Sequence, residues 1–439
     1  MTTLIKDANV LEGDRLVQKD ILIGEDGRIE SVGHGLEGDQ TVHADGLVAL
    51  PGVIDAHVHL REPGLTKKED FLSGTMAAVK GGVTSVIDMP NSIPQTTTVE
   101  ALLEKRDLAK KAVSNIGFYF GMGGRGTSDM EQAKNIAGIK LFLGSSTGDM
   151  LTDNDALIGD VLEKARLVGV HAEDERIIQD NKKRYSDSSD PSTHSLIRSP
   201  EAAEKSVSDI LARHQGKKAH LHICHASTKA EIGLVALAKA RGQDVSMEAC
   251  THHLFLDISA YKRLGTLAQM NPPLRTKDQV AALWDGLRDG TVDTVATDHA
   301  PHLREEKEVG FPDAPSGVPG VENLLPLMLD AVAKERITLP HLVDLSAHHP
   351  ARIFGIEGKG FLQKGFDADI VLVDRKEEHT IRDDEQLTKC GWTPYDGMKV
   401  RGWPKMTFVN GIVVNDGGAT DKRSKGKELS FGSLAKVKR

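Results

Sequence analysis

The chain has 439 residues, more than a single hydrophobic core usually supports, so we expect one large domain and a smaller one. Its formal charge of −9 argues against general affinity for nucleic acids or membranes. Aromatic residues make up only 4% of the chain and glycines number 43, which favours many short strands and tight loops over a helical bundle.

Cysteine usage and the N-terminal sequence bear on the cellular compartment. Cys224, Cys250 and Cys390 are odd in number and far apart, which argues against a disulfide framework and favours a reducing cytosol. The N-terminus lacks a basic segment followed by an apolar stretch, and no apolar run approaches the length of a membrane span. We therefore expect a soluble, cytoplasmic protein.

Both ends of the chain consist of short apolar stretches separated by turns. In the first 50 residues these stretches are 4–5, 20–24, 28–32 and 41–46. Near the other end they are 369–374, 405–411 and 412–414, the last two joined by an Asn-Gly turn. Each end alone is small for a stable sheet, so we predict that residues 1–50 and 358–418 pair into one composite β domain.

Between these ends, strand-like runs alternate with helical patterns such as 98–112 and 229–241. This alternation predicts parallel strands with helical crossovers, at 52–58, 83–88, 115–121, 138–143, 168–172, 219–225, 244–249 and 293–298. Eight such units predict an α/β fold, a (β/α)8 TIM barrel, over residues 51–357. Beyond residue 418, basic residues outnumber acidic ones (Lys422, Arg423, Lys425, Lys427, Lys436, Lys438 and Arg439 against Asp421 and Glu428), and we expect a solvated, partly disordered tail over 419–439.

The first barrel strand ends in a His-x-His pair, His57 and His59, followed by Arg61 and a Glu-Pro-Gly break. Side chains at i and i+2 of a strand point to one face, so the two imidazoles lie side by side as chelating groups. The C-terminal ends of barrel strands meet at one mouth, where such folds carry out chemistry. Arg61 suits an anionic substrate held beside a metal.

Other ionisable residues stand at the C-terminal ends of further strands. Imidazoles with one carboxylate favour zinc or a similar divalent ion over calcium or magnesium. The residues that converge at the mouth are His57, His59, Lys140, His171, His225 and Asp298.

Lys140 is unusual because strand alternation points it into the barrel, where a charged amine beside metals would be destabilised. A neutral lysine amine can react with carbon dioxide to give an anionic carbamate with two oxygens able to bridge two metals. The alternative is a lysine that extends to the barrel rim or pairs with a carboxylate.

Two choices among neighbouring residues are open by periodicity alone. His220 and His222 share a strand with His225, which we select because the strand ends there. Asp88 could be a ligand by position, but the loop Met89-Pro90-Asn91 more plausibly presents Asn91 to the site.

Seven ordered motifs, spread over about residues 48–415, resemble the dihydroorotases of the amidohydrolase superfamily. They are Asp55-Ala-His-Val-His-Leu-Arg-Glu-Pro-Gly64, Asp88-Met-Pro-Asn91, Gly138-Ile-Lys-Leu-Phe142, His171-Ala-Glu-Asp174, Cys224-His-Ala-Ser-Thr228, Met270-Asn-Pro-Pro-Leu-Arg275 and Thr297-Asp-His-Ala-Pro-His302.

The resemblance implies a binuclear zinc site. His57, His59 and Asp298 would hold one Zn²⁺, His171 and His225 the other, and carboxylated Lys140 would bridge them. The substrate carboxylate would bind to Arg61, Asn91 and His302, and Asn271 would contact the pyrimidine ring. Residues 302–320 resemble the loop that closes over substrate in this family. Some relatives have Asp at the position of Lys140.

The implied reaction is the reversible hydrolysis of (S)-dihydroorotate to N-carbamoyl-L-aspartate, the third step of pyrimidine biosynthesis, with Asp298 transferring the proton. Hydantoinases and allantoinases share the metal ligands but act on substrates without this carboxylate, so Arg61 and His302 distinguish the two readings. A non-catalytic scaffold is the other alternative, but no ligand is missing here. For partners, the resemblance leaves open a complex with aspartate carbamoyltransferase and a homodimer.

Overall fold

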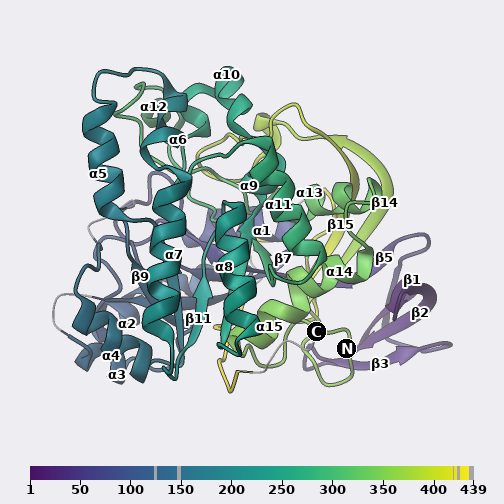
Figure 1. Cartoon of the computed structure of the whole chain (residues 1–439). Coiled ribbons are helices and arrows are strands. Elements are labelled where there is room, and N and C mark those ends of the chain that lie inside the picture. The colour runs from purple at the N-terminus through teal and green to yellow at the C-terminus, as the bar shows by residue number, and fades with distance from the viewer. Residues whose placement is uncertain (123–125, 146–149, 419, 423–425, 435–439) are drawn as a thin grey trace.

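The computed structural model describes residues 1–122, 126–145, 150–418, 420–422 and 426–434. A parallel barrel occupies one side of the molecule and a mixed β-sheet the other (Figure 1). This arrangement confirms the predicted (β/α)8 barrel with a composite β unit. The division at residues 50, 357 and 418 stays a prediction. Within the described chain, no helix is both long and apolar enough to cross a membrane.

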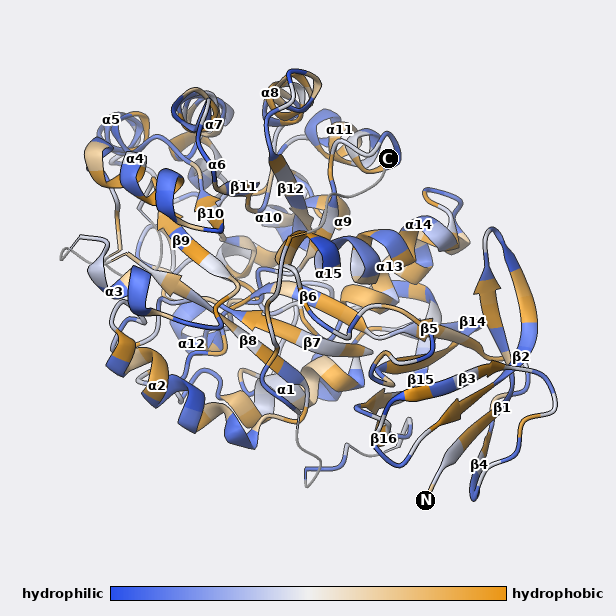
Figure 2. Cartoon of the chain, turned by 90° about the horizontal axis from the view of Figure 1, so that it is seen from below, coloured by the Kyte–Doolittle hydropathy of each residue, from blue (hydrophilic) through white to orange (hydrophobic). Residues whose placement is uncertain are grey.

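The barrel strands pair in chain order, each parallel to the next. They are β6 (Val53–Val58), β7 (Val83–Asp88), β8 (Asn115–Gly121), β9 (Gly138–Phe142), β10 (Leu167–His171), β11 (His220–Ile223), β12 (Val245–Cys250) and β13 (Thr294–Ala296). Each begins and ends within a few residues of the predicted strand. In Figure 2 the strands β6 to β9 are largely apolar, as expected for a sheet covered on its outer face by helices.

Contacts between the first and last strands close the barrel. Val58 and His299 form a parallel bridge, and the His59 amide donates to the His299 carbonyl at 2.7 Å. Inside the barrel, the Asp55 carboxylate accepts hydrogen bonds from the Thr297 amide and hydroxyl. Burial raises the pKa of Asp55 to about 7. The polar ends of β6 and β13 are therefore fixed against each other.

The chain forms longer helices outside the barrel and short helices in the connecting loops. They are α1 (Phe71–Lys80), α2 (Val99–Leu108), α3 (Ser128–Gln132), α4 (Asp155–Lys164), α5 (Glu175–Arg184), α6 (His194–Ile197), α7 (Pro200–His214), α8 (Lys229–Ala240), α9 (Thr251–Phe255), α10 (Tyr261–Leu264), α11 (Lys277–Arg288), α12 (Arg304–Lys307), α13 (Leu324–Ala333), α14 (Leu339–Val343) and α15 (His349–Phe354).

Capping residues fix several of these helix starts. Thr228 and Glu231 form a capping box that begins α8 three residues after His225. Thr98 accepts from the Ala101 amide and begins α2 where the sequence predicted it. The loop that carries His225 is therefore held between the end of β11 and a capped helix.

The second sheet joins both ends of the chain in the order β16-β15-β14-β5-β1-β2-β3, with β4 beside β1. Its strands are β1 (Thr3–Glu12), β2 (Arg15–Ile23), β3 (Ile29–Gly33), β4 (Gln40–His43), β5 (Val48–Pro51), β14 (Ile370–Thr380), β15 (Lys399–Val409) and β16 (Ile412–Asn415). β5 pairs antiparallel with β14, which is the predicted union of the two ends. Asn410 and Gly411 connect β15 to β16 with φ of 50° and 82°, as a tight hairpin turn requires.

Gly52 separates the sheet strand β5 from the barrel strand β6. A Cβ atom at this position would lie 2.1 Å from the Thr84 hydroxyl oxygen, so only glycine fits. The first site strand is thereby set directly against the second sheet.

The expectation of a solvated tail is wrong for residues 426–434. The Ile116 amide donates to the Lys427 carbonyl at 3.0 Å, and the Leu429 amide donates to the Ile116 carbonyl at 2.8 Å. Leu429 is buried in a cluster with Tyr119 and Phe354. Leu429 and Phe431 supply apolar surface that the basic composition of the tail obscured. Arg423, Lys425, Lys436, Lys438 and Arg439 lie outside the described residues.

Candidate active site

The side chains of His57, His59 and Asp298, here called the His57 group, converge at the barrel mouth. Asp298 follows β13, the strand that closes the barrel beside β6. Its Oδ1 lies 2.9 Å from His59 Nε2 and 3.3 Å from His57 Nε2. One ligand atom from each of the three buried side chains lies within 4.8 Å of the other two. This spacing allows all three to hold a single ion.

His171 and His225 form a second pair of imidazoles beside the His57 group. His171 ends β10 and His225 follows β11. His171 Nδ1 lies 2.9 Å from His225 Nε2, and the ring of His225 is 5.3 Å from that of His57. The sequence-predicted ligands therefore come together as two adjoining sets.

Lys140 is buried on β9 and points inward, as strand alternation predicted. Its Nζ donates to Cys224 Sγ at 2.9 Å. Burial lowers the pKa values of His171 and His225, and the charge of Lys140 adds to this lowering; the same charge opposes the rise in the pKa of His57, which puts the lysine near both sets. Among the described residues no carboxylate lies within ion-pair distance of Nζ, so the alternative of a paired lysine does not apply.

Two buried carboxylates that the sequence analysis did not select support the histidines. Glu248 Oε1 lies 2.5 Å from His57 Nδ1, and Glu173 Oε2 lies 3.1 Å from His171 Nε2. A carboxylate on the second ring nitrogen fixes the orientation and tautomer of a ligating histidine. Glu173 stands two residues after His171, and Glu248 is an acidic residue inside a barrel strand. Either signal could have identified them.

Three site residues adopt left-handed backbone conformations, with φ of 63° at Arg61, 38° at His225 and 46° at Asp298. Non-glycine residues in this region cost about 1–3 kcal/mol each and gather at functional sites, where the surrounding structure holds them. Each of these residues lies two or three positions beyond the end of a barrel strand. The strained turns direct the three side chains into the mouth.

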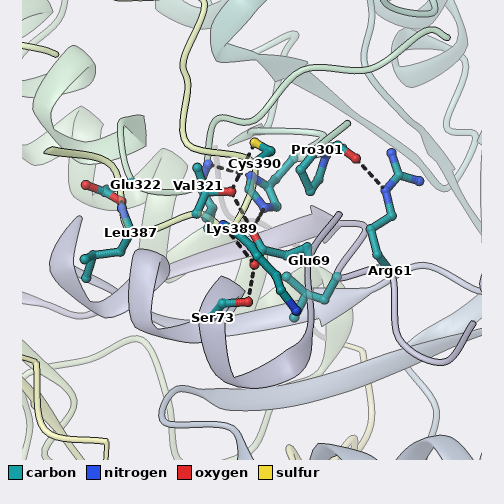
Figure 3. Close-up of polar contacts among 12 residues, drawn as sticks. Arg61, Glu69, Ser73, Pro301, Val321, Glu322, Leu387, Lys389 and Cys390 are labelled. Atoms are coloured by element: carbon teal, nitrogen blue, oxygen red, sulfur yellow. Dashed lines mark hydrogen bonds and ion pairs between the residues drawn. The ribbon is translucent and has the colours of Figure 1, made fainter. Parts of the chain in front are cut away.

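The predicted substrate-binding residues Arg61, Asn91 and His302 each have a polar partner at the mouth. Arg61 Nε donates to the Pro301 carbonyl at 3.0 Å (Figure 3), and its Nη2 lies 3.2 Å from His302 Nε2. Asn91 Oδ1 lies 2.6 Å from His59 Nδ1. Arg61 and His302 therefore lie together, and Asn91 supports a histidine of the His57 group.

Asn271 lies on the wall of a cavity of 610 Å³ that also includes His194, Arg198, Phe311 and Ser316. His194 Nε2 donates to Asn271 Oδ1 at 2.9 Å. Phe311 and Ser316 belong to the segment 302–320, the predicted closing loop. The cavity therefore has the loop on one wall and Asn271 on another.

The electrostatic field at the mouth favours a cation. Burial disfavours a charge on His57, but the carboxylates of Glu248 and Asp298 outweigh it and raise the pKa of His57 to about 10. Burial would raise the pKa of Asp298, but His57 and His59 outweigh it and hold this pKa well below its usual value. Burial lowers the pKa of His59 to about 4 and that of His225 well below its usual value. The donor set and its field fit a divalent metal.

The residues left open by periodicity are separated in space. His220 contacts Ser246, and His222 Nε2 lies 3.1 Å from Glu248 Oε2, both deeper in the barrel than His225. Asp88 forms a buried ion pair with Lys105 at 2.5 Å. The histidine that adjoins His171 is thus His225, and the loop side chain that reaches the site is that of Asn91.

Cys250, His252 and His253 form another buried set with ligand atoms within 4.8 Å. Burial raises the pKa of the Cys250 thiol well above its usual value, which disfavours the thiolate that metals require. His253 Nε2 donates to the Pro272 carbonyl at 2.9 Å.

Comparison with known proteins shows which family the chain resembles. The sequence profile described as the amidohydrolase family matches residues 48–414. The chain is 40% identical over 425 residues to a dihydroorotase from Halobacterium salinarum, covering 94% of this chain and 96% of the relative. It is 37% identical over 432 residues to a dihydroorotase from Methanosarcina acetivorans, covering 93% and 91%.

Solved structures with the same fold include a hydantoinase and a dihydropyrimidinase. An L-hydantoinase from Arthrobacter aurescens has a TM-score of 0.92 and 28% identity, covering 98% of this chain and 99% of its own. A dihydropyrimidinase from Brevibacillus agri has a TM-score of 0.93 and 27% identity over the full length of both chains. Sequence identity is therefore higher to the dihydroorotases, while the fold is also shared by the hydantoinase and the dihydropyrimidinase.

Proposed function

This chain belongs to the amidohydrolase family and, within it, to the dihydroorotases, and we propose that its histidine-rich mouth hydrolyses (S)-dihydroorotate reversibly to N-carbamoyl-L-aspartate. The observation that carries the proposal is the position of Arg61, Asn91 and His302 beside the His57 group. These donors suit a carboxylate next to the reacting amide.

We propose that the mouth binds two Zn²⁺ ions. His57, His59 and Asp298 would hold one, and His171 and His225 would hold the other. When bound, the metals would supply Lewis acidity that makes water nucleophilic near neutral pH and polarises the amide carbonyl. Glu248 and Glu173 would keep His57 and His171 in the ligating orientation.

We propose that Lys140 is carboxylated and bridges the two sets of ligands. Its burial, its position near both sets and the lack of an ion-pairing carboxylate among the described residues support this role. A carbamate replaces an uncompensated buried cation with an anion between cationic groups.

Lys140→Ala is expected to be inactive, with partial recovery on addition of short carboxylic acids such as acetate or propionate. A small carboxylate can occupy the space of the missing carbamate and restore a bridging anion. Activity should be measured against acid concentration, with the exposed Lys110→Ala as control. An unmodified amine turned away from two occupied metals in a metal-loaded crystal would contradict the bridging role.

Asp298 is proposed as the group that moves the proton. Its carboxylate is ionised at neutral pH and lies at the centre of the His57 group. It would accept the proton of the attacking water and deliver it to the departing ring nitrogen. The reverse sequence would close the ring in the synthetic direction.

Substrate binding is assigned to both sides of the mouth. Arg61, Asn91 and His302 would bind the α-carboxylate, and Asn271 would contact the pyrimidine ring. The segment 302–320 would close over the ring, since it forms one wall of the 610 Å³ cavity at Asn271. Closure excludes water from the reacting amide.

Arg61→Met is expected to raise the KM for dihydroorotate on the order of 10- to 100-fold, since hydrogen bonds to charged groups are worth about 1.5–3 kcal/mol. Turnover of an uncharged cyclic ureide, where it is measurable, should change little because such a substrate has no carboxylate to lose. The exposed Arg15→Met serves as control. Equal losses on charged and uncharged substrates would show that Arg61 supports the fold or the metal site instead.

An ultraviolet assay for loss of dihydroorotate tests the proposed reaction, run beside hydantoin and allantoin and combined with metal analysis. Dihydroorotate should be the preferred substrate, and two equivalents of zinc should accompany full activity. Preferential turnover of hydantoin would support the alternative that the chain is a hydantoinase. A solved hydantoinase has the same fold.

Several further assignments stay predictions. They are a cytoplasmic location, which the free cysteines support, a complex with aspartate carbamoyltransferase, and a homodimer. Size measurement in solution, alone and with aspartate carbamoyltransferase, tests the last two.

A further inference from the structure

Lys68 lies at the edge of the mouth, and no assignment above uses it. Its Nζ is 3.0 Å from His302 Nδ1 and 3.1 Å from Glu306 Oε1. The side chain is only 16% exposed. Because Lys68 contacts a histidine of the proposed substrate pocket, it can influence how that histidine binds substrate.

The backbone around Lys68 is fixed in place. The Leu65 amide donates to the Arg61 carbonyl, and the Lys68 amide donates to the Leu65 carbonyl, each at 2.9 Å. The next residue, Glu69, is fully buried and accepts from the Ser73 hydroxyl and the Lys389 amide (Figure 3). Lys68 and Arg61 are therefore held in one rigid turn on the same side of the mouth.

The hydrogen-bonding capacity of these groups determines the tautomer of His302. An ammonium group only donates, so Nδ1 of His302 accepts from Lys68 and the ring proton resides on Nε2. The Nε2–H group then donates to the Ser316 carbonyl at 3.1 Å. Burial and the charges of Arg61 and Lys68 lower the pKa of His302 well below its usual value, which keeps the ring neutral.

This tautomer makes two donors face each other. Arg61 Nη2 also only donates, and it lies 3.2 Å from His302 Nε2. The Nε2–H group already donates to the Ser316 carbonyl, so an acceptor that enters here would bind Arg61 Nη2 and share or take over the Nε2 proton. A carboxylate, with two oxygens and a negative charge, meets that need and is also attracted by Lys68.

We propose that Lys68 is a positioning residue that sets substrate specificity: it holds neutral His302 as an Nε2–H donor and adds positive charge where the substrate carboxylate binds. The inference rests on the proposed function, because it concerns how the same pocket selects anionic over uncharged cyclic amides. Lys68 acts through His302 and does not touch the reacting amide.

The test is the kinetics of Lys68→Met on dihydroorotate with the metal-loaded enzyme. KM should rise at least tenfold while kcat changes less than threefold, because the chemistry of the His57 group is untouched. Lys67→Met, which alters the exposed neighbouring lysine, should behave as wild type. Unchanged KM in a folded Lys68→Met enzyme would overturn the proposal.

Glu306→Gln separates this role from a purely structural ion pair. The change removes a charge that pairs with Lys68 and lies 3.8 Å from His302 Nδ1, while the amide oxygen can still accept from the Leu303 amide and Lys68 stays beside His302. KM should therefore rise clearly less than it does in Lys68→Met. A rise in KM equal to that of Lys68→Met would assign the effect to the Lys68–Glu306 pair and overturn the proposal.

A double-mutant cycle tests whether Lys68 acts through His302. In a His302→Gln background, Lys68→Met should raise KM clearly less than it does in the wild-type background, since the group it positions is already missing. Fully additive effects would overturn the positioning role. If Lys68→Met proves unstable, Lys68→Gln in the same cycle gives the same comparison.

Absence of dihydroorotate turnover by the wild type would instead reject the proposed function. Failure of the proposed function and failure of the role of Lys68 are therefore distinguishable.

Discussion

Asp298→Asn is expected to lower kcat for dihydroorotate by roughly 10²- to 10⁴-fold, the usual contribution of a positioned general base. The amide keeps the shape of the side chain, but it cannot accept the proton of the attacking water. It also weakens the cation-favouring field at His57 and His59, so metal affinity should fall as well. Turnover should be measured at saturating substrate and at several zinc concentrations, which separates lost proton transfer from lost metal.

The matched control for this variant is Asp14→Asn, which removes an exposed carboxylate in the second sheet. Near-normal turnover by Asp298→Asn would assign the proton transfer to another group. A loss fully restored by added zinc would leave Asp298 as a metal ligand only.

His57→Ala and His225→Ala are each expected to abolish measurable activity and to remove bound metal. Each change deletes a ligand from one of two adjoining sets, and a site built from few ligands loses affinity steeply when one is missing. In His57→Ala the carboxylate of Glu248 also loses one of its buried partners. Metal content by mass spectrometry after dialysis, together with activity, gives the measurement.

His43→Ala provides the comparison, since His43 is an exposed histidine of the second sheet. Its metal content and activity should match the wild type. A fully active His57→Ala or His225→Ala enzyme without stoichiometric metal would contradict the metal assignment.

The barrel could be predicted from sequence because each of its strands is a local signal. Runs such as 83–88 and 115–121 are short and rich in β-branched or aromatic residues, and the structure has strands over the same residues. The cap at Thr228 and the Asn410-Gly411 turn are equally local. The His-x-His pair could be found for the same reason.

The long-range contacts that support the site could not be predicted in this way, because they join distant parts of the chain. His57 and Glu248 are 191 residues apart, and Lys68 and His302 are 234 apart. No periodicity connects such positions until the fold is known. The packing of residues 426–434 was missed for a related reason, since two apolar side chains within a basic segment are a weak signal of burial.

The pairing of β5 with β14 has a consequence for synthesis on the ribosome. Val48 pairs with Val373, and until that partner is made, the early strands β1, β2 and β5 keep one edge without a neighbour. At typical translation rates the interval is on the order of tens of seconds. During that time the nascent chain exposes a β edge open to intermolecular pairing. The early strands are therefore a segment of this protein that would benefit from chaperone protection before release.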